Sequence, residues 1–203
     1  DLLGARRHAS AEGRVRDAAS VTRKTIAPNL DLIPSHLDLF TIDLDMASEV
    51  ARERKLKKAL APVIDKYKVV VCDCPPNLTI PTQNALAMST HYVVPISPDY
   101  LSGIGVGLLL NRVKELSEAM ETTLQHVGIV ISRVGRPALH RDQTVAAIRA
   151  NFGSLVFNQT ISERVKVSES AATKQSIADM GDFQAASEFR VVSDELLTRM
   201  GIP

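Results

Sequence analysis

The chain has 203 residues, of which 45% are hydrophobic, 23% are charged and only 4% are aromatic, and its formal net charge is +1. This composition is ordinary for a globular α/β domain with a sizeable core. The scarcity of aromatic residues argues against stacking platforms for single-stranded nucleic acid, and the near-neutral charge leaves room only for a local basic patch.

The small number of cysteines and the lack of a long apolar run indicate which compartment suits the protein. Cys72 and Cys74 are too few and too close for a disulfide framework, which indicates a reducing compartment. No apolar run approaches the ~20 residues of a membrane span, and the first residues do not have the pattern of a signal peptide.

The first part of the chain predicts mainly helices and two short strands. Residues 1–28 are polar and arginine-rich, which favours a short helix or two with loops. Residues 29–34 alternate apolar and polar side chains and end at a proline, as a short strand does. Residues 37–64 have a helical pattern with a basic segment at Arg52–Lys58. Lys68–Cys72 is a continuous apolar run, typical of a strand buried on both faces.

Helices and strands alternate through the rest of the chain. A short helix is expected near residues 83–88, and apolar residues recur at helical spacing at residues 104–120, 145–152 (ended by Gly153) and 185–200. Three further segments have the character of strands, at residues 91–96, 126–134 and 155–161. The alternation predicts an α/β fold, with a mostly parallel sheet flanked by helices on both faces. We expect a single domain over residues 1–203, with residues 1–28 at its periphery.

Asp73 follows the expected strand Lys68–Cys72 directly, and Pro75 and Pro76 stop that strand. A carboxylate at the end of a buried strand would be desolvated unless something pairs with it, and a hard cation is a usual partner. In enzymes that use nucleoside triphosphates, an aspartate in this position helps hold Mg²⁺ at the phosphates. The alternative is an aspartate that caps the next turn or helix.

Cys72 and Cys74 flank Asp73 and would share the opposite face of a strand. A metal site would need further Cys or His side chains nearby, so buried structural cysteines are the favoured interpretation.

A specific resemblance begins at this aspartate. The run "YKVVVCDCPPNLTIPTQNALAMSTHYVVPISPDYLSGIGVGLLL" (residues 67–110) resembles the ParA/Soj-type partition ATPases, which are deviant-Walker P-loop proteins. The family joins a hydrophobic strand, "DCPP", a "TxNAL" helix, "VxxPxxPxYxSxxGxxxL" and a long helix in this order. "NLDLIPSHLDL" (residues 29–39) and "FNQTISERVKVSESAATKQSI" (residues 157–177) resemble the flanking segments of the family. The resemblance therefore covers nearly all of the chain.

The resemblance implies a P-loop NTPase-like fold and an ATPase that uses ATP and Mg²⁺, with Asp73 as the catalytic and metal-binding residue. The chain contains no G-x-x-x-x-G-K-[ST] phosphate loop. We expect that loop, and the aspartate-rich switch segment of the family, upstream of Asp1; a natural pseudo-ATPase is the alternative. Residues 1–203 alone are then expected to bind ATP weakly or not at all.

The resemblance also implies a set of nucleotide-binding residues. Pro98 and Asp99 match a family loop beside the nucleotide and the dimer partner, although the same residues also suit the start of a helix. Ser132 matches a position where many relatives have an asparagine that reads the adenine edge. Serine has one hydroxyl in place of an amide that carries both a donor and an acceptor, so base selectivity at this position stays open. The backbone around Ile161, Ser162 and Val165 is expected to supply further contacts.

A basic stretch lies between residues 133 and 174, which contain seven Lys or Arg residues and three Asp or Glu residues. Family members bind DNA nonspecifically through basic residues of this part of the chain. The expected DNA-binding residues are Arg133, Arg136, Arg164, Lys166 and Lys174. Arg164 and Lys166 would share a face if their segment is extended. The alternative is an ordinary solvated face.

The resemblance further implies a homodimer that forms on ATP, nonspecific double-stranded DNA as a ligand, and a ParB-type centromere-binding protein that stimulates hydrolysis. The expected location is cytoplasmic and nucleoid-associated. A membrane-binding relative is disfavoured, because the end "SDELLTRMGIP" is not a basic amphipathic helix. A non-catalytic adaptor of the same fold remains an alternative, whereas an iron–sulfur carrier would want a late C-x-x-C pair that the chain lacks.

Overall fold

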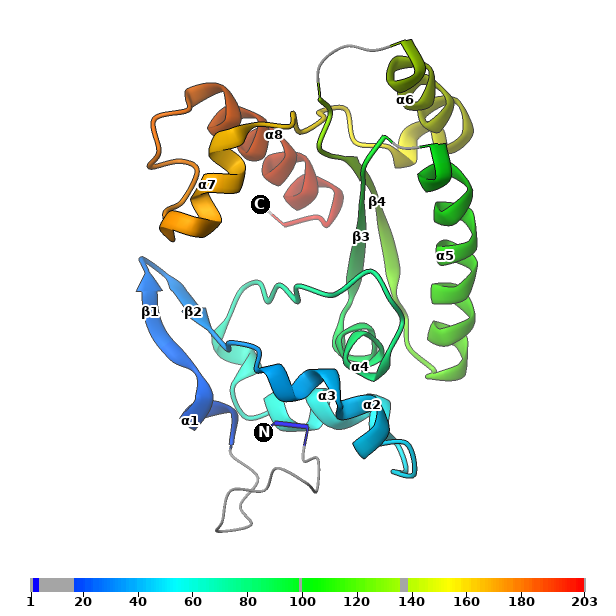
Figure 1. The fold of residues 1–203 in the computed structure, drawn as a ribbon. Helices are drawn as coiled ribbons and strands as arrows, with labels where there is room; N and C mark the ends of the chain where they lie inside the picture. Colours follow the sequence, from blue (N-terminus) through cyan, green and yellow to red (C-terminus); the bar gives the residue numbers. More distant parts are fainter. Residues whose placement is uncertain (1, 4–16, 99, 136–138, 203) are drawn as a thin grey trace. The chain divides into compact units, whose positions relative to one another are not determined.

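The computed structural model describes residues 2–3, 17–98, 100–135 and 139–202 (Figure 1). Its contacts divide the chain into two compact units. The first unit comprises residues 1–90 and 119–122, and the second comprises residues 91–118 and 123–203. The expectation of a single domain stays a prediction.

A β-hairpin opens the first unit after helix α1 (Ala18–Val21). Strands β1 (Arg23–Ala27) and β2 (Leu30–Leu32) pair antiparallel. The strand predicted in residues 29–34 is confirmed as β2. The purely helical and loop structure expected for residues 1–28 is wrong at β1, because pairing with β2 satisfies its backbone as a strand.

The hairpin is tied to Tyr67 by a small polar cluster. The Asp31 carboxylate accepts hydrogen bonds from the Tyr67 hydroxyl (2.7 Å), the Lys24 ammonium (2.9 Å) and the Thr25 N–H (2.7 Å). These donors lower the pKa of Asp31 to about 2.

The helical region predicted for residues 37–64 is confirmed, but in short pieces. These are η2 (Leu37–Phe40), α2 (Ile42–Asp45), η3 (Arg52–Arg54), α3 (Lys55–Leu60) and η4 (Ile64–Lys66). The longer helix α4 (Ile80–Met88) contains the helix predicted at residues 83–88. Buried side chains of these helices, among them Ile42, Met46, Leu60 and Ile80, form the core of the unit.

Asn84 of α4 is completely buried. Its side-chain oxygen accepts the Leu56 N–H (2.9 Å), and its amide donates to the carbonyls of Arg52 (2.8 Å) and Ile80 (2.9 Å). The asparagine of the "TxNAL" motif therefore ties α4 to η3 and α3.

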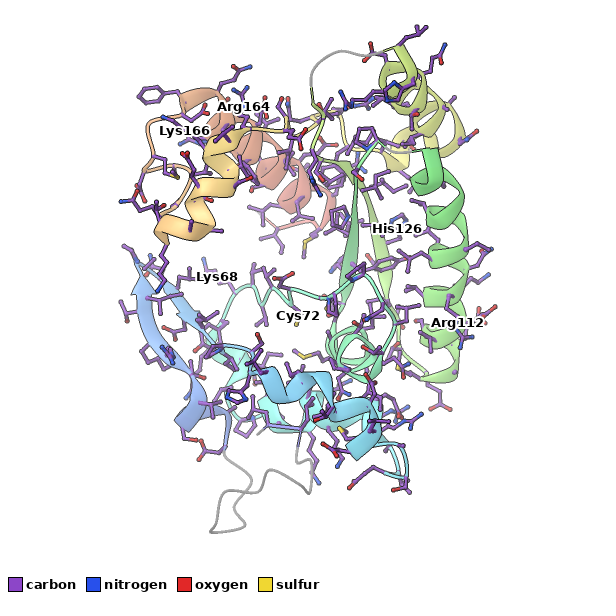
Figure 2. All side chains as sticks on the ribbon, in the orientation of Figure 1. Lys68, Cys72, Arg112, His126, Arg164 and Lys166 are labelled. Atoms are coloured by element: carbon purple, nitrogen blue, oxygen red, sulfur yellow. The ribbon has the colours of Figure 1, made fainter. Side chains whose placement is uncertain are left out.

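The apolar run Lys68–Cys72 does not form the buried strand that the sequence predicts (Figure 2). No strand pairs with it in the described part of the chain, and Val69, Val70 and Val71 are 40%, 44% and 85% exposed. An apolar pattern signals a tendency to be buried, whereas a strand also needs a neighbour that supplies hydrogen bonds. Cys74 is exposed and Cys72 is half-buried, so the expectation of two buried cysteines is wrong as well.

Two parallel strands, β3 (His91–Ile96) and β4 (Gln125–Ile131), form the sheet of the second unit. Helix α5 (Tyr100–Ala119) connects them, and the unit continues with α6 (Leu139–Phe152), η5 (Gly153–Leu155), α7 (Val165–Thr173) and α8 (Phe183–Arg199). Parallel strands joined by a helical crossover confirm the predicted α/β class.

Helices lie on both faces of this sheet (Figure 1). On one face, apolar side chains of β3 and β4 pack with α5 and α6, and the buried members of this core are Val94, Ile96, Val106, Ile129, Ile131, Ile148 and Val156. On the other face, Val127, Val130 and Phe157 pack against Val192, Leu196 and Met200 at α8. Strand β4 is therefore buried on both sides, as its apolar sequence predicts.

The strand predicted at residues 155–161 is only partly right. This segment runs beside β4, and the N–H groups of Phe157 and Ile161 donate to the carbonyls of Ile129 (2.9 Å) and Ile131 (2.9 Å). The pairing is reduced to isolated parallel bridges at Val156 and Ser162. Between them the chain turns away from β4 at Asn158, whose N–H instead donates to the Glu195 carboxylate (3.0 Å).

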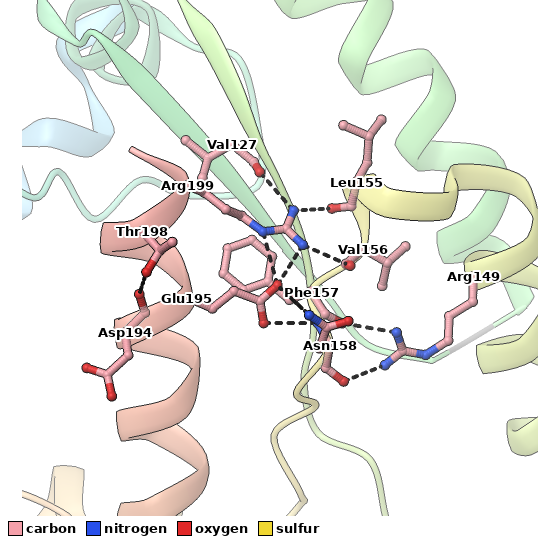
Figure 3. Close-up of polar contacts among 10 residues, drawn as sticks. All are labelled: Val127, Arg149, Leu155, Val156, Phe157, Asn158, Asp194, Glu195, Thr198 and Arg199. Carbon is pink, nitrogen blue, oxygen red and sulfur yellow. Dashed lines mark hydrogen bonds and ion pairs between the residues drawn. The ribbon is translucent and has the colours of Figure 1, made fainter. Parts of the chain in front are cut away.

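Arg199, at the end of α8, holds this segment against β4 (Figure 3). Its guanidinium donates to the carbonyls of Val127 (3.1 Å), Leu155 (3.3 Å) and Val156 (3.1 Å). It also pairs with Glu195 (2.6 Å) and lies 4.3 Å from the centre of the Phe157 ring. One side chain thus joins α8, β4 and the segment that runs beside it.

Gly128 makes room for this guanidinium. The register of β3 and β4 shifts by one residue at Val127, as in a β-bulge, and Gly128 adopts a φ of 148°. A Cβ atom here would lie 2.6 Å from Nη1 of Arg199 and 2.9 Å from Cε2 of Phe157, and would also collide with the Leu155 carbonyl. The position therefore requires glycine.

Candidate functional site

Asp73 lies in the irregular segment between η4 and α4, in the first unit. Its carboxylate is exposed, so the expectation of a desolvated carboxylate at the end of a buried strand is wrong. Pro75 and Pro76 follow it and are exposed as well. An exposed carboxylate keeps its oxygens accessible to a cation or to water.

The chemistry of this segment suits Mg²⁺ better than a metal bound entirely by protein. Within the described residues, no group of three or more His, Cys, Asp or Glu side chains is arranged to hold a metal ion. Mg²⁺ at nucleotides uses one or two carboxylates and takes its other ligands from phosphate and water. Partial burial raises the pKa of Cys72, and partial burial together with the nearby charges of Cys72 and Asp73 raises the pKa of Cys74, which disfavours the thiolate form that binds metals.

Several of the predicted nucleotide residues meet beyond the carboxyl ends of β3 and β4, in the second unit. Ser132 follows β4, and both its N–H (2.7 Å) and its hydroxyl (3.2 Å) donate to the Ile96 carbonyl at the end of β3. Ile161 donates to the Ile131 carbonyl (2.9 Å) and accepts from the Val134 N–H (3.1 Å). This edge is where ligands bind in open α/β sheets.

The other predicted nucleotide residues lie around this edge. Pro98 is buried just after β3, and Asp99 lies outside the described residues. Val165 begins α7 and is largely exposed. Asp73 belongs to the other unit, so the structure describes it apart from these residues.

Ser162 contacts a buried carboxylate that the sequence analysis missed. Glu188 of α8 is 9% exposed and accepts both the N–H (2.8 Å) and the hydroxyl (2.8 Å) of Ser162. It also accepts from Nη2 of Arg164 (3.3 Å), while Asp182, the N-cap of α8, lies 4.0 Å from Nη1 of Arg164.

The sequence contains a signal for these anchors. Charged residues interrupt the apolar stripe of α8 at helical spacing, in the series Ala185, Glu188, Val192, Glu195 and Arg199. A charge inside an otherwise apolar stripe indicates a buried polar contact.

The predicted DNA-binding residues have different surroundings. Arg164 is the N-cap residue of α7 and is engaged by two carboxylates, whereas Lys166 lies within α7 (Figure 2). The expectation that these two share a face of an extended segment is wrong, because a helix begins between them. Lys166 donates to the Met180 carbonyl (3.2 Å), and Lys174 is exposed at the end of α7.

Two further arginines complete the predicted basic surface. Arg133 is exposed and lies 3.8 Å from Glu163, and Arg136 lies outside the described residues. Long cationic side chains on an exposed surface suit contacts with phosphate. An exposed ion pair such as that of Arg133 and Glu163 is weak, so little free energy is lost when Arg133 leaves it for a phosphate.

A family model described as an AAA domain matches residues 10–126. The chromosome-partitioning ATPase Soj of Treponema pallidum is 32% identical over 203 residues, which cover 99% of this chain and 76% of that protein. An uncharacterized protein of Mycobacterium tuberculosis is 31% identical over 175 residues, or 86% of this chain. The aligned part is 55% of the length of that mycobacterial relative.

The fold is also found in solved structures. The cobyrinic acid a,c-diamide synthase of Mycobacterium smegmatis, solved with an ATP analog and magnesium, superposes with a TM-score of 0.74 at 22% identity. The superposition covers 90% of this chain and 68% of the synthase. At this identity the likeness concerns the fold.

Proposed function

Because the chain belongs to the ParA/Soj-type family of partition ATPases, we propose that it is the ATPase of a DNA partition system, plasmid or chromosomal. The observation that carries the proposal is the similarity to the partitioning ATPase of T. pallidum, which covers 99% of this chain. In this proposal the protein binds ATP and Mg²⁺, forms a homodimer on ATP and hydrolyses ATP when a ParB-type centromere-binding protein stimulates it. It acts in the cytoplasm, on the nucleoid.

Asp73 is the residue of this chain that would hold the Mg²⁺ of the nucleotide. The ion would neutralise charge on the phosphates. The exposed carboxylate of Asp73 fits this role, because Mg²⁺ keeps several waters and needs few protein ligands. Ser132 and the backbone of Ile161, Ser162 and Val165 would contact the base, with Pro98 and Asp99 beside them.

Hydrolysis by the full-length protein tests the enzymatic part of the proposal. Asp73→Ala should abolish DNA- and partner-stimulated ATP hydrolysis while circular dichroism shows an intact fold. Asp65→Ala removes another exposed carboxylate of the same unit and should keep the wild-type rate. An Asp73→Ala rate within about twofold of wild type would refute the assignment. ATP binding by the wild type without hydrolysis would favour the adaptor alternative.

DNA binding would use the exposed cations around α7. Lys166 and Lys174 lie near its two ends, and Arg133 lies after β4. Each lysine that contacts one phosphate contributes about one unit to the slope of log affinity against log salt.

Replacing Lys166 and Lys174 by alanine should lower this slope by about 2 on duplexes of any sequence. The control is Lys114→Ala, which removes an exposed lysine of α5 in the same unit. An unchanged slope in the double variant would mean that α7 is an ordinary solvated helix.

Among the described helices, none combines the length and apolarity needed to cross a membrane.

A further inference from the structure

Glu188 is an unusual residue for the core-facing side of α8. A buried carboxylate is costly unless hydrogen bonds compensate for its lost hydration. Here the backbone and hydroxyl of Ser162 and the guanidinium of Arg164 supply three such bonds, at 2.8, 2.8 and 3.3 Å. These partners come from one short segment, so the carboxylate binds that segment to α8.

The segment is held from a second side by β4 and the residues after it. Ile161 exchanges hydrogen bonds with Ile131 and Val134, and the Glu163 N–H donates to the Val134 carbonyl (2.9 Å). Residues 161–164 therefore lie between a backbone ladder on one side and the carboxylates of α8 on the other. Backbone groups can discriminate between ligands only when their positions are fixed in this way.

We propose that Glu188 is a positioning residue for recognition of the nucleotide base, with Arg164 as its partner in that role. The inference rests on the proposed function, which places the backbone of Ile161–Val165 at the base. Glu188 touches no nucleotide itself; it fixes the backbone that would read the base edge. Arg164 then belongs to this support and contributes little to DNA binding, because two carboxylates already engage its guanidinium.

The test compares ATP with GTP, which share the triphosphate and differ in the base. Calorimetric titration of the full-length protein with each Mg²⁺ nucleotide gives the preference for ATP as a ratio of dissociation constants. Glu188→Ala should lower that preference by about tenfold, which corresponds to the loss of one hydrogen bond between the freed backbone and the base. Glu188→Gln keeps one acceptor for the Ser162 N–H and should restore part of the preference. Asp194→Ala removes an exposed carboxylate of the same helix and should retain all of it.

A residue with a merely structural role would weaken both nucleotides equally and leave their ratio unchanged. A wild type that prefers ATP, together with a folded Glu188→Ala variant that keeps the full preference, would overturn the inference alone. A wild type that binds both nucleotides equally would also overturn it. A wild type that binds neither nucleotide would overturn the proposed function first, and the inference with it.

Arg164 offers an independent check. Arg164→Ala should lower the preference for ATP and leave the salt slope of DNA binding at its wild-type value. A slope reduced by about 1, with the preference for ATP unchanged, would return Arg164 to the DNA surface and contradict its role beside Glu188.

Discussion

Replacing Arg199 by alanine should destabilise the second unit more than any other surface-reaching substitution in α8. The change removes hydrogen bonds to three carbonyls, each worth about 1 kcal/mol net, and the stacking on Phe157, worth about 0.5–1 kcal/mol. The side chain is 21% exposed, so water reaches some of the vacated acceptors and offsets part of the loss. We expect a decrease of about 3 kcal/mol in the free energy of unfolding.

Equilibrium unfolding in urea, followed by far-ultraviolet circular dichroism, measures this loss as a shift of the midpoint at constant slope. Arg199→Lys keeps the charge beside Glu195, but an ammonium cannot span three carbonyls, so we expect it to recover less than half of the loss. Arg190→Ala removes an exposed arginine of the same helix and should change the free energy by less than about 0.5 kcal/mol. A loss below about 1 kcal/mol for Arg199→Ala would refute the role of the guanidinium as a clamp.

Three further predictions concern backbone shape and acid stability. Gly128→Ala should destabilise by about 2 kcal/mol or more in urea unfolding, whereas Gly105→Ala, whose Cβ meets nothing within 4 Å in helix α5, should stabilise by about 0.5–1 kcal/mol. Burial lowers the pKa of His126; a hydrogen bond with Gly128 opposes this effect, and the charge of Arg199 adds to it. The unfolded state therefore binds a proton at a higher pH than the folded state does. Stability should therefore fall as the pH drops below about 6.5, and His126→Phe should flatten that part of the profile. The pKa of Asp31 is about 2, so its contribution is complete above its ordinary value near 3.8 and is lost as the pH falls towards 2; Asp31→Asn should remove this part of the acid unfolding profile.

Elements with a strong and complete pattern could be predicted from the sequence. Strand β4 combines an apolar run with burial, β3 is an apolar run that pairs with it, and α5 repeats its apolar residues over its whole length. The run at Val69–Val71 has the same composition as these strands yet stays irregular and exposed. Composition records the preference of the side chains, whereas a strand depends on a partner elsewhere in the chain, which a local pattern does not contain.

The candidate site was predictable in its sequence positions and less so in its contacts. Ser132 bonds to Ile96 at the end of β3, and Ile161 bonds to Ile131 at the end of β4, because the parallel strands end at the same edge of the sheet. The helix that begins after Arg164 has no side-chain cap, so the sequence there has no capping signal that predicts its start. The link from Ser162 to Glu188 joins residues far apart in the chain, and only the charge within the apolar stripe of α8 pointed to it.

The exposed run Val69–Val71 also bears on how the protein behaves at high concentration. β-branched residues whose backbone pairs with no strand in the described chain are a template for addition of the same run from another copy. Lys66 and Lys68 before the run, and Asp73 with Pro75 after it, act as gatekeepers, because charge and proline both oppose the growth of such a stack. Removing one of these charges, as in Lys68→Val, extends the apolar run and should speed aggregation measured by turbidity, even though the folded core is untouched.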